Sequence, residues 1–494
     1  MKIQQFLEHH GIVTNPFAEE DAQTDPVFRD HCIRSTYHPT WDKIFGNPAQ
    51  PSTSIVFGEK GAGKTALRLQ MAGRLADFNR DHPNERVYVI EYDDFNPFLD
   101  RFAETLSARK RKPARALAEW KLWDHMDAIL SLAVTGLVDR ILSDSSEAAA
   151  TIDPDLVAAM GRHQKRDLLL LAACYDQSTA ETFKGRWHRL RRKLKFRTWK
   201  SLWDRAAGVA VLLVVAAAVI MSGNWSWLAS PWPYVFAILG WVPWAVRAWK
   251  WFWQARGVAR NVRVGNHETR PLRQVLMHFA GPDISGQPLP NKQRTDDRYE
   301  LLAKFQGLLR TLGYAGIIVL VDRLDEPHLI NGSADQMKAL LWPMLDNKFL
   351  KLPGIGFKLL LPIELTPFID REQREFYERA RLDKQNMVPS LEWTAESLYD
   401  VANARLQACA ADGSLPTLRD LFEDSVSDQR LHEALRSLRV PRHLFKFLYR
   451  VFVAHASAHT DDRPAWKISA ETFESTLALY SRDQDAVDRG LRAG

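Results

Sequence analysis

The chain has 494 residues, of which 46% are hydrophobic and 26% charged, so its composition is globular and its length suffices for two or three domains. The net charge of +6 does not indicate a nucleic-acid-binding protein, because two short stretches, 184–205 and 247–263, hold the basic surplus and the remainder is mildly acidic. The three cysteines, Cys32, Cys174 and Cys409, match no metal or redox spacing and are typical of packed thiols in a reducing cytosol.

Residues 1–95 are expected to hold an N-terminal segment and the first half of a nucleotide-binding core. The opening residues, MKIQQFLEHHGIV, lack the apolar core of a signal peptide, so we expect membrane insertion to be directed from within the chain. Ser54–Phe57 predicts a short strand, and the glycine-rich stretch GEKGAGKTA at 58–66 follows it and opens an amphipathic helix. This stretch satisfies the P-loop pattern G-x-x-x-x-G-K-[ST].

A P-loop binds the phosphates of a nucleotide through its backbone. The glycines let N–H groups turn toward the β-phosphate, and the helix N-terminus adds the positive end of its dipole. Lys64 would reach the β and γ phosphates of ATP, and Thr65 would ligate Mg²⁺. The residues assigned to nucleotide binding are Gly58, Glu59, Lys60, Gly61, Ala62, Gly63, Lys64, Thr65 and Ala66.

Residues 96–205 are expected to form a helical insertion that ends in the basic stretch WHRLRRKLKFRTWKSLW, either an interfacial amphipathic segment or a cytoplasmic stalk. After Arg205 the chain runs 41 residues without a charged side chain, until Arg247. Two apolar segments, Ala206–Gly223 and Trp232 to about Trp249, flank a turn rich in Asn, Ser and Pro. As helices they would each cover about 27 Å, close to the ~30 Å hydrocarbon core of a bilayer. The sequence therefore predicts a transmembrane hairpin within 206–253.

The charges beside this hairpin predict its orientation. Ten Lys or Arg against one acid precede it between 184 and 205, and five basic residues with no acid follow between 247 and 263. By the positive-inside rule both flanks and both termini are cytoplasmic, in a two-helix protein of the inner (cytoplasmic) membrane that contacts membrane lipid. The alternative is a buried helical hairpin in a soluble domain, which the long uncharged run disfavours.

Residues 264–390 are expected to complete the core. Gly316–Val321 (GIIVLV) is a continuous apolar run typical of a parallel strand buried on both faces, and Asp322 follows it where the magnesium-binding acid of a P-loop NTPase belongs. Asp325 and Glu326 lie close enough in sequence to orient an attacking water as catalytic residues. The alternative for this acidic cluster is a solvated loop between a strand and a helix.

Further candidates follow toward the C-terminus. Phe357–Leu361 predicts the next strand, after which Glu364 either reads the γ-phosphate side or caps a loop. Arg379 and Arg381 are candidate fingers that would act on a neighbouring subunit. Residues 391–494 are expected to form a helical lid in which Arg442, beside Pro441, senses the γ-phosphate or is simply a surface arginine of a basic helix.

Taken together, these segments resemble the KAP-type P-loop NTPases, in which a membrane hairpin is likewise inserted between the two halves of the nucleotide site, and the wider AAA+ and STAND group related to origin-recognition ATPases. The stretches that carry the resemblance are GEKGAGKT at 58–65, IIVLVDRLDE at 317–326, LEWTAESLYDVANARL at 391–406 and VPRHLFKFL at 440–448.

The resemblance implies an α/β fold: a P-loop NTPase parallel sheet with a helical insertion, a two-helix transmembrane hairpin and a C-terminal helical lid. It also implies that Thr65 and Asp322 hold Mg²⁺ beside ATP and that Asp325 or Glu326 polarises water. Arg323 departs from the family, which often has an acid there, so the base has two candidates and we expect slow hydrolysis. Residues 15–17 (Asn-Pro-Phe) resemble the segment that lies against the adenine in related ATPases, or form a turn with a core phenylalanine.

Two functions are compatible with these features. The first is a membrane-anchored, ATP-hydrolysing switch or assembly platform that forms homo-oligomers or binds a partner protein, in bacterial signalling or anti-phage defence. The second is a membrane-tethered ATPase that handles nucleic acid. The first is favoured, because no winged-helix signature follows Val440 and the basic surplus lies beside the membrane segments. An anchor with an inactive site is disfavoured by the intact Lys64, Thr65 and Asp322.

Overall fold

The computed structural model describes residues 1–34, 36–143, 152–197, 203–223, 225–345, 348–380, 382 and 386–488. Its centre is a five-stranded, all-parallel sheet with the strand order β2-β3-β4-β1-β5. The strands are β1 (Ser54–Gly58), β2 (Arg86–Tyr92), β3 (Tyr314–Val321), β4 (Ile355–Pro362) and β5 (Asn386–Val388). The strands predicted at Ser54–Phe57, Gly316–Val321 and Phe357–Leu361 are therefore confirmed.

Both faces of the sheet are buried, which explains why these strands could be predicted from the sequence. Every residue of β1 and β4 is buried, and so is every residue of β3 except Ala315. A parallel sheet is covered by helices on both sides, so its strands appear as continuous apolar runs. The register pairs Gly58 with Pro362 and Val321 with Leu359, which brings the carboxyl ends of β1, β3 and β4 to one edge of the sheet. In open α/β sheets ligands bind at this edge.

Helices fill the chain between β2 and β3 and form one hydrophobic core with the sheet. Before the hairpin they are α4 (Asn96–Thr105), η2 (Ala108–Lys110), α5 (Pro113–Glu119), α6 (Leu122–Leu142), α7 (Pro154–Ala159), α8 (Arg162–Tyr175) and α9 (Phe183–Lys193). After the hairpin they are α12 (Thr269–Leu276), α13 (Gly281–Ile284) and α14 (Asp296–Thr311). A fully buried ion pair, Asp127 to Arg298 at 3.0 Å, ties α6 to α14 across the insertion.

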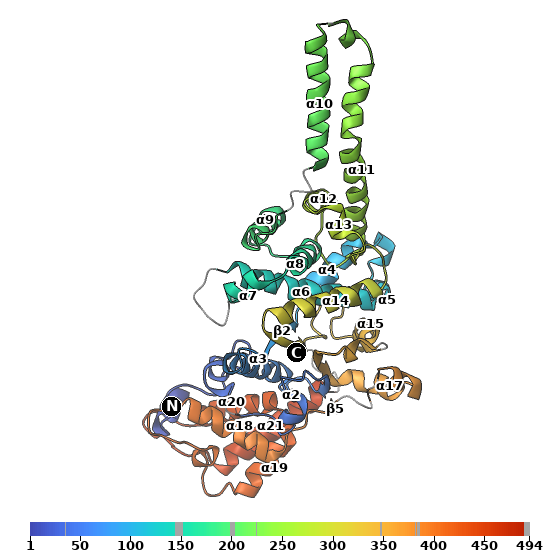
Figure 1. Ribbon diagram of the computed structural model, residues 1–494. Coiled ribbons are helices and arrows are strands. Elements are labelled where there is room, and N and C mark those ends of the chain that lie inside the picture. Colours follow the sequence, from blue (N-terminus) through green and yellow to red (C-terminus); the bar gives the residue numbers. More distant parts are fainter. Residues whose placement is uncertain are drawn as a thin grey trace.

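The uncharged stretch forms two helices that project from one end of the molecule as a hairpin (Figure 1). They are α10 (Trp203–Ser222) and α11 (Trp232–Asn261), joined by the short helix η4 (Trp225–Ala229). Gly208 and Gly240 allow them to approach closely, because a Cβ added at either would lie within 3 Å of Trp241 or Val211 on the opposite helix. The predicted end of the second segment near Trp249 is too early: α11 continues to Asn261, and its last turns, from Trp251 to Val258, join the main core.

Only α10 has the length and composition of a membrane span among the helices of the described residues. Its best 18-residue window has a mean hydropathy of 2.2 and is 11% buried. The second helix falls short because its tryptophans, its prolines, Tyr234 and Arg247 lower its hydropathy. The predicted pair of spans is therefore supported for one helix by these criteria. One such helix is weak evidence of a membrane protein, so the membrane location remains a proposal.

A second hydrophobic core lies at the opposite end of the molecule, in the C-terminal helices (Figure 1). These helices are α18 (Ala395–Ala408), η8 (Leu418–Leu421), α19 (Asp428–Leu438), α20 (Pro441–Ala458) and α21 (Ala470–Asp488). The N-terminal helix α1 (Ile3–His9) packs with them through Phe6 and Leu7, and Phe17 joins the same core. The first residues of the chain thus belong structurally with its last hundred.

The remaining elements cover the sheet and its loops. They are η1 (Phe28–Cys32), α2 (Trp41–Phe45), α3 (Lys64–Asp81), α15 (Ala334–Leu345), η5 (Lys348–Lys351), η6 (Ile363–Leu365), α16 (Thr366–Asp370) and α17 (Arg374–Ala380).

Candidate functional site

A cavity of about 190 Å³ opens at the carboxyl edge of the sheet. Segments far apart in the sequence line it: the glycine loop with the first turns of α3, the acidic loop after β3, residues of the N-terminal stretch between Glu20 and His38, and residues in or just before α18 and in α20. Both halves of the predicted site therefore meet here, although the whole insertion and the hairpin separate them in the chain.

The backbone of the loop between β1 and α3 requires glycine at two positions. Gly61 and Gly63 have φ values of 89° and 91°, in the left-handed region that L side chains rarely adopt. A Cβ at Gly61 would also lie 2.6 Å from the Cβ of Arg442, so only glycine lets the lid approach the loop this closely. The loop ends at the N-terminus of α3, where free backbone N–H groups favour an anion.

Lys64 is folded back over this loop. Its Nζ donates to the carbonyl oxygens of Gly58 and Glu59, at 2.8 and 3.0 Å. Burial lowers the pKa of Lys64, while the nearby carboxylates of Asp325, Asp322 and Glu364 act in the opposite direction. A phosphate group would replace the two carbonyl contacts with stronger charge-assisted hydrogen bonds.

Thr65 and Asp322 are in direct contact, as the magnesium prediction requires. The Thr65 hydroxyl donates to Oδ2 of Asp322 at 2.9 Å, and Asp322 is 1% exposed. Burial raises the pKa of Asp322, opposed chiefly by the hydrogen bond from Thr65. Within the described residues no three His, Cys, Asp or Glu side chains gather as a metal site. The pair suits Mg²⁺, which is commonly held by one or two protein oxygens together with phosphate oxygens and water.

Arg68 is a residue of this site that the sequence analysis missed. It lies one turn after Lys64 in α3, is 2% exposed, and its Nη1 contacts Glu91 and, at 3.0 Å, Oδ2 of Asp93 just beyond β2. Its Nε lies 3.5 Å from Oδ2 of Asp322. Arg68 thus links Glu91 in β2 and Asp93 just after it to Asp322, the candidate magnesium ligand. The sequence could have indicated Arg68, because it lies four residues after Lys64 and side chains at this spacing share one face of a helix.

The two candidate bases, Asp325 and Glu326, both line the cavity, but their surroundings differ. Glu326 Oε1 lies 3.4 Å from Nε of Arg323, a residue with a positive φ of 59°. Burial raises the pKa of Glu326, and the charge of Arg323 opposes this effect. Asp325 is the carboxylate that acts most strongly on the pKa of Lys64. Glu364, in η6, also acts on Lys64 from the end of β4.

Arg442 and Trp393, from the C-terminal part of the chain, contact the loop. The backbone N–H of Arg442, in the first turn of α20, points to the carbonyl of Gly61 at 3.4 Å, and its side chain lies on the cavity wall. The Arg442 Nε is 3.8 Å from a carboxylate oxygen of Glu20. Trp393, which the sequence analysis did not select, donates from Nε1 to the carbonyl of Ala62 at 2.9 Å. A movement of the lid would therefore change the shape of the loop.

The segment expected to lie against the adenine is not in the cavity wall. Phe17 is buried in the C-terminal core against Phe445 and Phe452, as the alternative of a core phenylalanine required. The carbonyl of Pro16 accepts from Arg405 in α18 at 2.7 Å. Residues slightly later in the chain, Ala22, Phe28 and Cys32, contribute to the apolar part of the wall, together with apolar residues of α3, α18 and α20.

The proposed arginine fingers cannot be placed. The side chain of Arg379 and the whole of Arg381 lie outside the described residues.

Comparison of the chain with protein-family models, with curated proteins and with solved structures finds no match. The fold assignment therefore rests on the sheet itself, a five-stranded parallel sheet consistent with a Rossmann-like or a P-loop fold.

Proposed function

We propose that the protein is a membrane-anchored P-loop NTPase of the KAP type that binds and hydrolyses Mg²⁺–ATP and changes its assembly with nucleotide state. The observation that carries this proposal is the direct contact between Thr65 and Asp322 beside the lysine of a glycine loop. Those three residues are the minimum that phosphate and magnesium binding needs.

The chemistry of the cavity supports phosphate binding at its loop end. Positive charge in the cavity comes from Lys64, from Arg442 and from the N–H groups at the start of α3. Three acids, Asp322, Asp325 and Glu326, line the same cavity. Thr65 and Asp322 would hold Mg²⁺, which would neutralise the phosphate charge that develops during transfer. Asp325 or Glu326 would then accept a proton from water positioned for attack.

Removing either candidate base should slow turnover without preventing binding. Asp325→Asn and Glu326→Gln keep the size of the side chain but remove its basicity. We therefore expect the substitution of whichever residue is the base to lower kcat by roughly 10-fold or more, within the usual range for a general base. Phosphate release by the detergent-purified protein measures this, with Asp335→Asn, an exposed acid of α15, as the matched control. Wild-type turnover by both cavity variants would show that neither acid is the base.

The contact between the lid and the loop supports a nucleotide-dependent switch. Arg442 is the cation of α20 that contacts Gly61, so loss of the γ-phosphate would remove an anion from its reach. We propose that this change alters assembly with further copies of the chain or with a partner protein. The KAP resemblance suggests that the output serves bacterial signalling or defence against phage.

Arg442→Ala should separate binding from assembly. Lys64, Thr65 and Asp322 remain, so ATP should still bind, but the difference in oligomeric mass between the ATP and ADP states should disappear. Light scattering after size-exclusion chromatography in detergent reports this mass, and Arg436→Ala, exposed on α19, is the control. A wild-type protein with the same mass in both nucleotides would remove the reason to describe it as a switch.

The hairpin supports the membrane part of the proposal. Most of the large hydrophobic side chains that are exposed in the described part of the chain lie on α10, η4 and α11. Soluble proteins rarely expose an apolar surface of this extent. The basic flanks lie at the ends of α10 and α11 that join the body of the molecule. By the positive-inside rule they would keep the nucleotide site and both termini in the cytoplasm.

A further inference from the structure

A basic helix, α9, lies near the foot of the hairpin, between the nucleotide core and α10 (Figure 1). One of its faces is buried through Arg186, Trp187 and Leu190. The opposite face exposes Lys184 and Arg192, and within the described part of the chain neither side chain forms an ion pair. The helix therefore has an inward apolar face and an outward cationic face.

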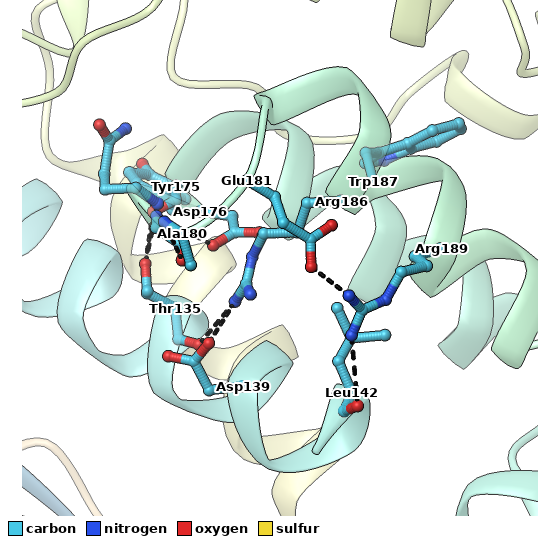
Figure 2. Close-up of polar contacts among 12 residues, drawn as sticks. Thr135, Asp139, Leu142, Tyr175, Asp176, Ala180, Glu181, Arg186, Trp187 and Arg189 are labelled. Atoms are coloured by element: carbon cyan, nitrogen blue, oxygen red, sulfur yellow. Dashed lines mark hydrogen bonds and ion pairs between the residues drawn. The ribbon is translucent and has the colours of Figure 1, made fainter. Parts of the chain in front are cut away.

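The inward face fixes α9 firmly to its neighbours (Figure 2). The Arg186 guanidinium donates to Asp176 at 2.7 Å and to Asp139 at 2.8 Å, so it bridges α6 and the end of α8. Trp187 donates from Nε1 to the carbonyl of Leu169 at 3.0 Å. This helix is not a loose stalk, and the direction in which its cationic face points is set by these contacts.

Groups from two other segments lie beside α9: His278, just after α12, and Arg205 of α10. His278, just after α12, stacks on Trp187 with ring centroids 5.6 Å apart, and its Nδ1 lies 3.1 Å from Nη1 of Arg191. His188 packs edge-on against His278 at 4.9 Å. The basic side chains that act electrostatically on these two histidines are Lys184, Arg191, Arg192 and Arg205, and together with His188 and His278 they are called the cationic cluster.

Basic neighbours dominate the electrostatic surroundings of the two histidines. Burial is the largest cause that lowers the pKa of His278, to about 4, and the charges of Arg191, Arg205 and Lys184 lower it further, so this imidazole is neutral near pH 7. Burial also lowers the pKa of His188, again followed by cationic neighbours. Repulsion between like charges at this density is relieved by a bound anion.

We propose that the cationic cluster binds the phosphate headgroup of an anionic phospholipid. This inference rests on the proposed membrane location and adds a specific lipid class and site to it. Arg205 is the third residue of α10, and the exposed Trp203, Trp249 and Trp253 mark the same end of the hairpin, where aromatic side chains would meet the bilayer interface. The cluster would then lie at the depth of the headgroups. The apolar helices of the hairpin, beside it, would contact the acyl chains.

Lipid selectivity tests this proposal directly. The full-length protein, purified in dodecyl maltoside, is titrated with micelles that contain a short-chain phosphatidylglycerol or the matching phosphatidylcholine, with inorganic phosphate, and with a single-stranded oligonucleotide. Each Lys or Arg beside an anionic surface strengthens binding about five-fold, so Lys184→Gln with Arg192→Gln should weaken phosphatidylglycerol binding by roughly 30-fold.

Two matched variants complete the design. Lys184→Arg with Arg192→Lys keeps both charges and should retain binding, and Lys348→Gln with Arg463→Gln removes two exposed charges elsewhere and should leave it unchanged. Equal phosphatidylglycerol affinity in the wild type and the cluster variant would overturn the proposal. So would equal affinity for phosphatidylcholine, equally tight binding of inorganic phosphate, or a preference for the oligonucleotide.

Failure here is distinguishable from failure of the proposed function. The cluster variant retains Lys64 and the whole hairpin, so it should bind ATP and sediment with membranes like the wild type. A wild type that binds no ATP would contradict the nucleotide proposal and leave the lipid result standing. A wild type that is soluble without detergent would contradict the membrane location whatever its affinity for lipid.

Discussion

Replacing Lys64 with alanine should abolish ATP binding. The Nζ of Lys64 donates to two backbone carbonyls of the loop and would bind the β and γ phosphates in their place. Charge-assisted hydrogen bonds contribute about 1.5–3 kcal/mol each, so the loss of two should weaken binding by roughly 100-fold or more. Equilibrium binding of a fluorescent ATP analogue measures the change.

The control for this experiment lies on the same helix. Arg74 is exposed on α3 and away from the cavity wall, so Arg74→Ala removes a positive charge without touching the loop and should bind ATP like the wild type. If Lys64→Ala binds as tightly as Arg74→Ala, the phosphates are not held at this loop.

Charges placed in the hairpin should release the protein from the membrane. Leu213 and Ile238 are 62% and 67% exposed on α10 and α11. An arginine at the centre of a membrane helix costs about 2.5–3.5 kcal/mol on insertion scales, so Leu213→Arg with Ile238→Arg should move the protein from the carbonate-resistant pellet to the soluble fraction. Leu415→Arg, at a position 78% exposed in the loop between α18 and η8, should leave it in the pellet.

Labelling of an introduced cysteine tests on which side of the membrane the turn of the hairpin lies. The three native cysteines are buried, so a thiol reagent should report almost only on Ser226→Cys, in the turn between the helices. We expect labelling of intact cells or spheroplasts from outside by a reagent that does not cross the membrane. Wild-type protein found in the soluble fraction without detergent would contradict the membrane proposal before labelling is attempted.

The sequence predicts best what is local or periodic. The buried strands appear as apolar runs because both faces of the sheet are covered. The loop around Gly61 is recognisable in the sequence because its backbone geometry requires glycine at fixed positions. The meeting of Thr65 with Asp322 also follows, since the carboxyl ends of parallel strands share one edge.

Contacts between distant segments leave no such pattern in the sequence. The packing of Phe17 into the C-terminal core and the hydrogen bond from Trp393 to Ala62 depend on how the lid folds over the loop, which neither segment encodes alone. Arg68 was overlooked because an arginine on an amphipathic helix is usually exposed, whereas here three carboxylates compensate its burial. The length of α11 depends on the main core, which buries Ala255 and Val258 and extends the helix beyond the apolar stretch.

Hydrolysis of ATP by the detergent-purified full-length protein, with magnesium and with a chelator, tests the central claim most directly. The Lys64 side chain over the glycine loop and the hydrogen bond between Thr65 and Asp322 predict turnover that requires magnesium and is absent from Lys64→Ala, and Arg323 predicts that this turnover is slow. Turnover by the wild type that does not exceed the Lys64→Ala background, at saturating ATP and magnesium, would contradict the assignment of this cavity as an ATPase site.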